Sequence, residues 1–158
     1  MSESEAMSYV LGYTGSNDIS SRTSQFAQSQ WCYSKGFDGA CPIGPALAST
    51  AAVPDPSKFR VRGLKNGYVM QDCGVEAALD TTVDKVWRKR HDLQYSEACE
   101  LSFSEHYLIP GNGTVIITGT PAGVGVGKSP KVSLRYGDLF KVDITPHIGT
   151  LISEMENE

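Results

Sequence analysis

The chain has 158 residues, of which 40% are hydrophobic and 20% are charged, and its formal net charge is −4. A chain of this length predicts one domain with a modest core, and its apolar content excludes a wholly disordered protein. The 14 basic and 18 acidic residues give no electrostatic reason to expect nucleic-acid binding. No apolar run approaches the roughly 20 residues of a membrane span, so we expect no membrane association either.

The four cysteines predict a reducing environment. They lie at irregular spacings, with no CxxC pair and no Cys/His zinc pattern, at Cys32, Cys41, Cys73 and Cys99. The N-terminal residues show no secretory signal pattern. We therefore expect reduced thiols and a cytoplasmic location.

The first third of the chain mixes helix and turn signals. Residues 2–8 combine a serine N-cap with early glutamates and predict a short helix. A β-rich run, Tyr9–Tyr13, follows, and the polar stretch 15–31 opens with turn residues and is then compatible with helix. Four prolines within residues 36–56 indicate that any strand there is short or irregular.

The clearest local signal is a hairpin. Phe59–Leu64 alternates apolar and basic residues, which is typical of a half-buried strand. Asn66-Gly67 then predicts a tight turn, with Tyr68–Gln71 as the returning strand. The following residues, 74–105, are more helical in composition and more charged.

The last third predicts further strands. Thr114–Thr118 is an uninterrupted β-branched run and predicts a buried strand. Lys131–Arg135 and Leu139–Ile144 predict a strand pair around a Tyr-Gly-Asp turn, and the acidic residues after Leu151 predict a frayed tail. The sequence thus predicts an α+β, mostly β domain over residues 1–152, with a tail at 153–158.

Two common catalytic patterns fail on inspection. Ala122–Ser129 reads AGVGVGKS and fits a relaxed phosphate-loop pattern, but such a loop must open a helix, and Pro130 follows instead. The three histidines are isolated from one another, and no G-x-S-x-G nucleophile pattern is present.

The segment from Gly12 to Pro45 concentrates groups that could act on a substrate. Asp18, at a predicted strand-to-helix turn, can reach a divalent cation, and Lys35 could stabilise an anionic oxygen that develops on a substrate. The residue types alone favour an ordinary interpretation, in which these side chains form turns and helix caps.

Six separated motifs follow one another in a fixed order. They are YVLGYT at 9–14, NDIS at 17–20 with Arg22, CPIGP at 41–45, Asn66-Gly67 with Gln71-Asp72, TGTPAGVG at 118–125, and Gly137-Asp138 with IGTL at 148–151. In order and spacing they resemble the fumarylacetoacetate hydrolase family, in the branch that holds acylpyruvate hydrolases and oxaloacetate decarboxylases. On this resemblance the phosphate-loop pattern becomes a substrate-binding turn of a different fold.

The resemblance implies a fold, a chemistry and a site. The fold would be a mixed β-sheet roll with short helices, and the reaction would be hydrolysis or decarboxylation at a C–C bond of a small 2-oxo or 1,3-dicarbonyl acid. It implies a Mg²⁺ or Mn²⁺ ion held by Asp18. Gln25, Lys35 and Thr120 would bind the substrate, and Lys35 would also be catalytic. The resemblance also implies a homodimer, because members of the family commonly dimerise.

The departures from the family pattern concern the metal. The family's E-x-E ligands and the lid with its histidine and glutamate precede the part matched here, so the chain is expected to be N-terminally truncated. Glu3 and Glu5 spell E-x-E but stand where a helix is expected to start. Asp18 alone should bind Mg²⁺ weakly, in about the millimolar range. The segment between Asp72 and Pro110 is also longer than in the family.

Three interpretations stay open from the sequence. The chain is an active metal-dependent enzyme, a catalytically impaired domain that pairs with itself or with a full-length homologue, or an incomplete gene model. The motifs are shared by hydrolases, decarboxylases, isomerases and dehydratases, so they do not select among these reactions.

Overall fold

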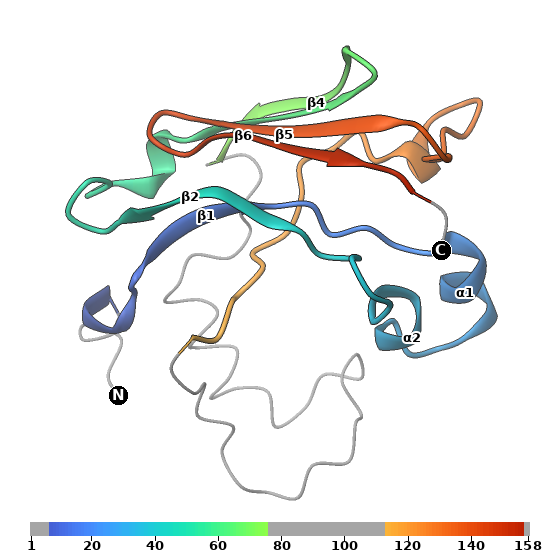
Figure 1. The fold of residues 1–158 in the computed structure, drawn as a ribbon, viewed down its shortest axis with the longest axis horizontal. Coiled ribbons are helices and arrows are strands. Elements are labelled where there is room, and N and C mark those ends of the chain that lie inside the picture. The colour runs from blue at the N-terminus through green and yellow to red at the C-terminus, as the bar shows by residue number, and fades with distance from the viewer. Residues whose placement is uncertain (1–6, 76–112, 157–158) are drawn as a thin grey trace, which may run out of the picture.

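The computed structural model describes residues 7–75 and 113–156, and most of its regular structure is β-strand (Figure 1). The strands are β1 (Gly12–Ser16), β2 (Ile43–Ser49), β3 (Arg60–Lys65), β4 (Tyr68–Gly74), β5 (Leu139–Thr145) and β6 (Gly149–Glu154). The helical segments are α1 (Arg22–Ala27), α2 (Cys32–Lys35) and the 3₁₀ turns η2 (Pro56–Lys58) and η3 (Gly125–Gly127). The predicted α+β, mostly β class is confirmed. In these described ranges no helix has the length and apolar character of a membrane crossing.

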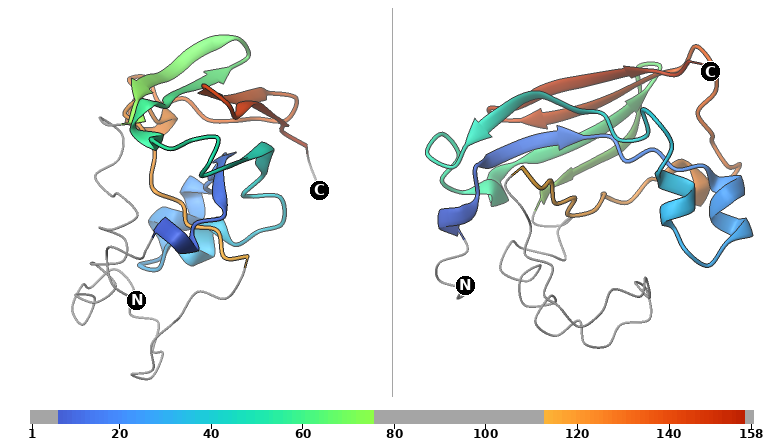
Figure 2. Two further views of the ribbon diagram at one scale, coloured as in Figure 1. Left: turned by 90° about the vertical axis from the view of Figure 1, so that its left-hand side faces the viewer. Right: turned by 60° about the horizontal axis from the view of Figure 1, so that its bottom comes forward.

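The strands form two layers. One sheet has four strands in the order β4-β3-β5-β6, and β1 pairs with β2 in a second, two-stranded sheet that lies against β5 and β6 (Figures 1 and 2). All strand pairs among residues 7–75 and 113–156 are antiparallel, so this part of the chain does not show the mixed sheet that the sequence led us to expect. Both short helices lie at one end of the layers, beyond the end of β1.

The predicted hairpin is confirmed. β3 and β4 pair on either side of Asn66-Gly67, whose φ angles of 50° and 85° are both positive, as a type I′ turn requires. β4 extends to Gly74, three residues beyond the predicted end at Gln71. β2 is seven residues long, and its pairing with β1 shifts register between Tyr13 and Gly15, so the predicted irregularity in this proline-rich region is also present.

Two predicted strands are wrong. Thr114–Thr118 forms no strand, and the side chains of Val115, Ile116 and Ile117 are 40–51% exposed. β-branched composition favours extended backbone, but a strand also needs a neighbour with free backbone groups, and no described strand pairs with this run. Lys131–Arg135 likewise lies outside both sheets; only its predicted partner, now β5, is a strand.

The predicted fraying after Leu151 is also wrong for residues 152–156, while residues 157–158 lie outside the described residues. β6 continues to Glu154 in register with β5, where Leu139 lies opposite Glu154. The Met155 N–H then donates to the Asp138 carbonyl at 2.9 Å, and the Gly137 N–H donates to the Met155 carbonyl at 2.8 Å. These bonds close the end of the β5–β6 pair. The composition hid the strand because Ile152 and Glu154 are exposed and the half-buried position between them, residue 153, is a serine.

The core lies between the two sheets. Tyr13 of β1 meets Phe59 edge to face, with ring centroids 5.9 Å apart and an interplanar angle of 75°. The buried hydrophobic residues around this contact are Ala48, Val53, Phe59, Val75, Val142, Ile144 and Ile148. Burial raises the pKa of the Tyr13 hydroxyl. The core therefore packs the two-stranded sheet, β1 and β2, against the four-stranded sheet.

Asp138 ties the β3–β4 hairpin to the start of β5. Its carboxylate accepts hydrogen bonds from Lys65 Nζ at 2.9 Å, from Asn66 Nδ2 at 2.7 Å and from the Arg135 N–H at 2.7 Å. The bonds from Lys65 and Asn66 lower the pKa of Asp138 to about 2, from an ordinary value of 3.8. The ionised form of Asp138 is therefore the form that stabilises this corner.

We expect Asp138→Asn to lower the urea midpoint of unfolding near neutral pH. Because the pKa of Asp138 is lower in the folded protein, its contribution is complete above about pH 4 and is lost as the pH falls through about 2. Urea titrations of both proteins between pH 7 and pH 2 should show their midpoints converging in acid. Asp72→Asn, which removes the exposed Arg60–Asp72 pair, is the control and should have a smaller effect. A midpoint difference that is independent of pH would contradict this account.

Candidate functional site

Backbone pairing holds the Asn17-Asp18 turn in place. After β1, the Asn17 N–H donates to the Pro42 carbonyl at 3.1 Å, and the Ile19 N–H donates to the Ala40 carbonyl at 2.9 Å. Asn17 is itself buried. Asp18 stands between these two bonds, so the segment just before β2 fixes the backbone from which its carboxylate projects.

The two short helices are joined through Ser21 and Ser34. Ser21 caps α1 by accepting from the Ser24 N–H, and its own N–H donates to the Ser34 carbonyl at 2.9 Å. Ser34 in α2 is fully buried, and its hydroxyl donates to the Trp31 carbonyl at 2.7 Å. Helices of this length are not stable alone, so these bonds set the positions of Gln25 and Lys35.

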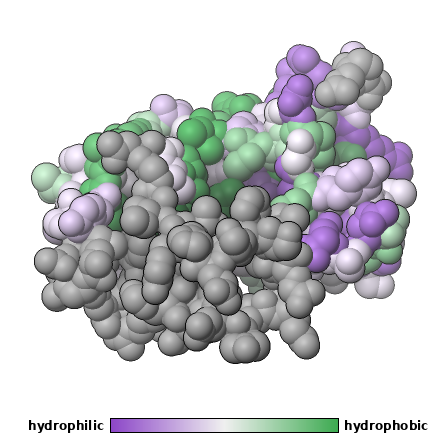
Figure 3. All heavy atoms as spheres, turned by 90° about the horizontal axis from the view of Figure 1, so that it is seen from below, coloured by the Kyte–Doolittle hydropathy of each residue, from purple (hydrophilic) through white to green (hydrophobic). Residues whose placement is uncertain are grey.

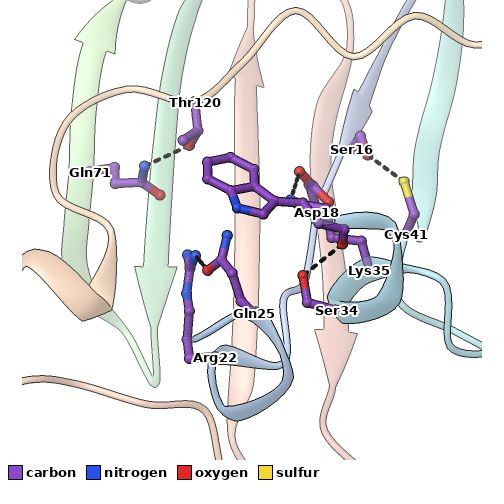
Figure 4. Close-up of polar contacts among 10 residues, drawn as sticks. Ser16, Asp18, Arg22, Gln25, Ser34, Lys35, Cys41, Gln71 and Thr120 are labelled. Carbon is purple, nitrogen blue, oxygen red and sulfur yellow. Dashed lines mark hydrogen bonds and ion pairs between the residues drawn. The ribbon is translucent and has the colours of Figure 1, made fainter. Parts of the chain in front are cut away.

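Lys35 and Asp18 form an ion pair at one edge of the site (Figure 4). The Lys35 side chain is 29% exposed and that of Asp18 is 36% exposed. Lys35 is the last residue of α2, and Asp18 lies in the turn before α1. The pair therefore holds an ammonium group at a defined place while leaving it open to the cleft.

Gln25 presents an amide to the same cleft. It is the buried residue of α1, and its Oε1 accepts a hydrogen bond from Arg22 Nη1, one turn earlier. Arg22 uses one of the two acceptor positions of the oxygen, and the Nε2 group of Gln25 is the part of the amide that can donate to a ligand. In the view of Figure 4, the Arg22 and Gln25 side chains rise together from α1 toward the sheet.

Thr120 reaches the cleft from the opposite side. It lies on the extended segment before η3, and Gln71 of β4 binds it through an Nε2 to Oγ1 hydrogen bond of 2.7 Å. The same Gln71 nitrogen donates to the Pro121 carbonyl at 2.6 Å. The sequence pattern included Gln71 only as a motif position. Its contact with Thr120 spans 49 residues, and no local pattern predicts it.

The AGVGVGKS segment, residues 122–129, contacts strand β4. As expected, no helix follows it; η3 is a single 3₁₀ turn, and the residues after it are extended. Lys128 Nζ donates to the Met70 carbonyl at 3.2 Å. Met70 lies at the edge strand β4, where the β3–β4 register shifts so that Gly63 faces Gln71 and Leu64 faces Val69.

The four residues predicted for the site border one broad cleft, which more than half of the described residues line. Asp18, Gln25, Lys35 and Thr120 border it together with Gln71 and Arg22. The floor includes Phe59, Val142 and Ile144, which belong to the core between the sheets. Seen from below, apolar side chains gather around the central hollow, and polar ones gather toward one end (Figure 3). The border thus carries the Lys35 ammonium group, the Arg22 guanidinium group and the Asp18 carboxylate beside the polar side chains of Gln25 and Thr120, around an apolar floor.

The described residues do not by themselves form a metal centre. In residues 7–75 and 113–156, no group of three or more His, Cys, Asp or Glu side chains is close enough to share an ion. Asp18, the predicted ligand, has its Oδ2 occupied by Lys35. Mg²⁺ and Mn²⁺ normally take more than one carboxylate. Glu3 and Glu5 lie outside the described residues, and metal binding by Asp18 stays a prediction.

Comparison with known proteins identifies the family. The family model for the C-terminal domain of fumarylacetoacetate (FAA) hydrolase matches residues 1–156. The mitochondrial oxaloacetate tautomerase FAHD2A of Homo sapiens is 34% identical over 153 residues, which are 96% of this chain and 44% of the human protein. Its relative fahd2 of Xenopus laevis is 31% identical over 90% of this chain and 40% of its own length.

Solved structures agree with this assignment. A fumarylacetoacetate hydrolase from Exiguobacterium antarcticum matches with a TM-score of 0.80 and 31% identity, covering 100% of this chain and 51% of that one. A 5-carboxymethyl-2-hydroxymuconate delta-isomerase from Mycobacterium smegmatis matches with a TM-score of 0.74 and 30% identity, covering 53% of its own chain. The chain belongs to the fumarylacetoacetate hydrolase family, as the motifs predicted. It spans less than half the length of the curated relatives named above.

We expect Gly123→Ala to displace the Thr120 segment from β4. Gly123 has a φ of 111°, and a Cβ there would lie 2.2 Å from the Met70 carbonyl oxygen, so strain and collision add. The free energy of unfolding should fall by about 2–4 kcal/mol. Gly137→Ala is the control, because Gly137 has a φ of 77° but no atom within 4 Å of its Cβ position. Urea titration measures both, and equal losses would contradict the collision.

We expect Mn²⁺ to bind this chain weakly, with a dissociation constant in about the millimolar range, because Asp18 is a single and already paired carboxylate. Asp18→Asn should abolish the binding, and Lys35→Met should tighten it by removing the competing ammonium group. The control is Asp55→Asn, which should leave the affinity unchanged. Asp55 also borders the cleft and also pairs with a lysine, Lys58, but it is not the predicted metal ligand. Electron paramagnetic resonance of free Mn²⁺ measures the affinity. Micromolar binding would mean that groups outside the described residues complete the site.

Proposed function

We propose that this chain binds a small 2-oxo acid and stabilises its enolate. The observation that carries the proposal is the Lys35 ammonium group, held by Asp18 at the edge of an apolar cleft that Gln25 and Thr120 also border. An enolate carries negative charge on the former ketone oxygen, and a fixed cation lowers its free energy more strongly in such a site than in water.

The three groups suit different parts of the substrate. Lys35 would face the ketone oxygen, where the charge develops, and the Gln25 Nε2 group would donate to a neighbouring oxygen. Thr120, on the opposite side of the cleft, would bind the carboxylate. Binding at both ends would orient the bond that breaks relative to the ketone.

Decarboxylation is the reaction that these groups support best. In oxaloacetate, the bond between C3 and the C4 carboxylate breaks, CO₂ leaves, and the electron pair forms the enolate of pyruvate with its charge on the C2 oxygen. A solvent proton then adds to C3. The bond-breaking step needs no base, whereas hydrolysis must activate a water molecule and tautomerisation must remove a proton. The described residues supply a cation and donors, which decarboxylation uses.

Tautomerisation of oxaloacetate is a second candidate. The curated relatives from Homo sapiens and Xenopus laevis are named oxaloacetate tautomerases. Tautomerisation would pass through the enolate of oxaloacetate itself, which forms when a proton leaves C3 or the enol oxygen and which keeps the C4 carboxylate; a proton then adds to the oxygen or to C3. The hydrolysis of an acylpyruvate would also leave an enolate behind. The three reactions therefore share the demand that Lys35 would meet.

We expect the chain to accelerate the conversion of oxaloacetate to pyruvate, and Lys35→Met to slow it by about 10²–10³-fold, the usual cost of removing one group that stabilises an oxyanion. Lys58→Met removes the same charge at a side chain that is 77% exposed and should change little. Pyruvate formation and the decay of enol absorbance, followed separately, distinguish decarboxylation from tautomerisation.

Binding without turnover has its own meaning in this experiment. If the chain binds oxalate, an enolate analogue, but converts neither oxaloacetate nor an acylpyruvate, it is a binding domain with impaired catalysis. If a folded wild-type chain binds no oxalate at millimolar concentration, the proposal of a 2-oxo acid site is wrong.

A further inference from the structure

The Gln71 side chain carries information about where protons lie in the site. Its Nε2 atom is 2.7 Å from Thr120 Oγ1 and 2.6 Å from the Pro121 carbonyl oxygen. A backbone carbonyl can only accept a hydrogen bond, so the atom that faces Pro121 must be the nitrogen of the amide. This contact fixes the orientation of the amide without reference to any ligand.

The orientation of Gln71 sets the role of Thr120. The nitrogen has two hydrogens, of which one is used by the Pro121 carbonyl and the other points to Thr120 Oγ1. Thr120 therefore accepts from Gln71. A hydroxyl has one hydrogen and two lone pairs, so the hydrogen of Thr120 is left to donate to a different acceptor.

The surrounding strands hold this arrangement. Gln71 lies opposite Gly63 in the β3–β4 pair, and a Cβ at Gly63 would lie 2.8 Å from Gln71 Oε1. The absent side chain leaves room for the amide in this rotamer. Pro121 is buried, whereas Thr120 is exposed on the border of the cleft. The hydrogen bond from Gln71 to the Pro121 carbonyl thus ends at a buried residue, whereas the hydroxyl hydrogen of Thr120 has access to the cleft.

We propose that Gln71 is a positioning residue that makes the Thr120 hydroxyl a hydrogen-bond donor to the carboxylate of the bound acid. The inference rests on the proposed function for the identity of the ligand. It deepens that proposal because a carboxylate only accepts hydrogen bonds, so a site for it must present donors. Thr120 without Gln71 could turn its hydrogen toward the Pro121 carbonyl or toward water and lose this selectivity.

A double-mutant cycle with oxalate as the probe tests the inference. Thr120→Val and Gln71→Met should each weaken oxalate binding by about 10–100-fold, the cost of a hydrogen bond to a charged group. In the Thr120→Val background, Gln71→Met should change the affinity by less than about 2-fold, since Gln71 acts through Thr120. Isothermal titration measures all four proteins. Independent, multiplicative losses would overturn the inference and leave Gln71 with a purely structural role.

Reversing the polarity of residue 71 gives a second test. Gln71→Glu keeps the size of the side chain, but at pH 7 its carboxylate accepts the Thr120 hydrogen that the inference assigns to the ligand. Binding of oxalate should weaken at least as much as in Gln71→Met, and wild-type affinity would overturn the inference. Gln28→Met, at an exposed glutamine after α1, is the matched control.

A ligand-free measurement separates this inference from the proposed function. In the free protein, one side-chain amide proton of Gln71 should shift in the nuclear magnetic resonance spectrum when Thr120 is replaced by valine. If wild type binds no oxalate, the proposed function fails, while a shifted proton still supports the assigned polarity. If wild type binds oxalate and the Gln71 proton does not respond, the inference alone fails.

Discussion

The site depends on two backbone hydrogen bonds that join residues 17–19 to residues 40–42. These bonds place the Asn17-Asp18 turn beside the segment that leads into β2. Lys35 lies within the loop that they close, and its ammonium group meets Asp18 across that loop. Because α1 and α2 have only six and four residues, they hold no position without this closure and the Ser21–Ser34 bond. The position of the Lys35 ammonium group in the cleft therefore depends mainly on these backbone hydrogen bonds, and the ion pair with Asp18 adds to them.

The opposite side of the cleft is anchored differently. Here, where the β3–β4 register shifts, the Met70 carbonyl accepts from Lys128, and Gln71 binds the neighbouring Thr120 and Pro121. Gly123 permits the close approach that both contacts need. The first anchor comes from local chain closure and the second from an interruption in a sheet. The core around Phe59 connects them, so the width of the cleft depends on how the two sheets pack.

The sequence predicted what local chemistry determines. The Asn66-Gly67 hairpin was correct because both turn residues need positive φ, and few residue types adopt it readily. Thr114–Thr118 and the tail after Leu151 were wrong in opposite directions, because a strand depends on a partner that composition does not reveal. For the site, the motif pattern named Asp18, Gln25, Lys35 and Thr120, which all border one broad cleft, and their roles stay predictions. Their hydrogen-bond partners, above all Gln71, follow from tertiary contacts between distant segments.

The hydrogen-bonding inventory of the cleft also limits its chemistry. Lys35 can only donate, the Gln25 oxygen accepts from Arg22, and Gln71 makes Thr120 an acceptor within the protein. Each of these three groups therefore turns a hydrogen, or a positive charge, toward the cleft. These three groups suit a ligand with oxyanions, while the Asp18 and Asp55 carboxylates on the same border can accept hydrogen bonds. On the proposed function, such a surface would lower the free energy of an enolate without moving a proton, and a reaction that begins with proton removal would need a base in addition to these groups.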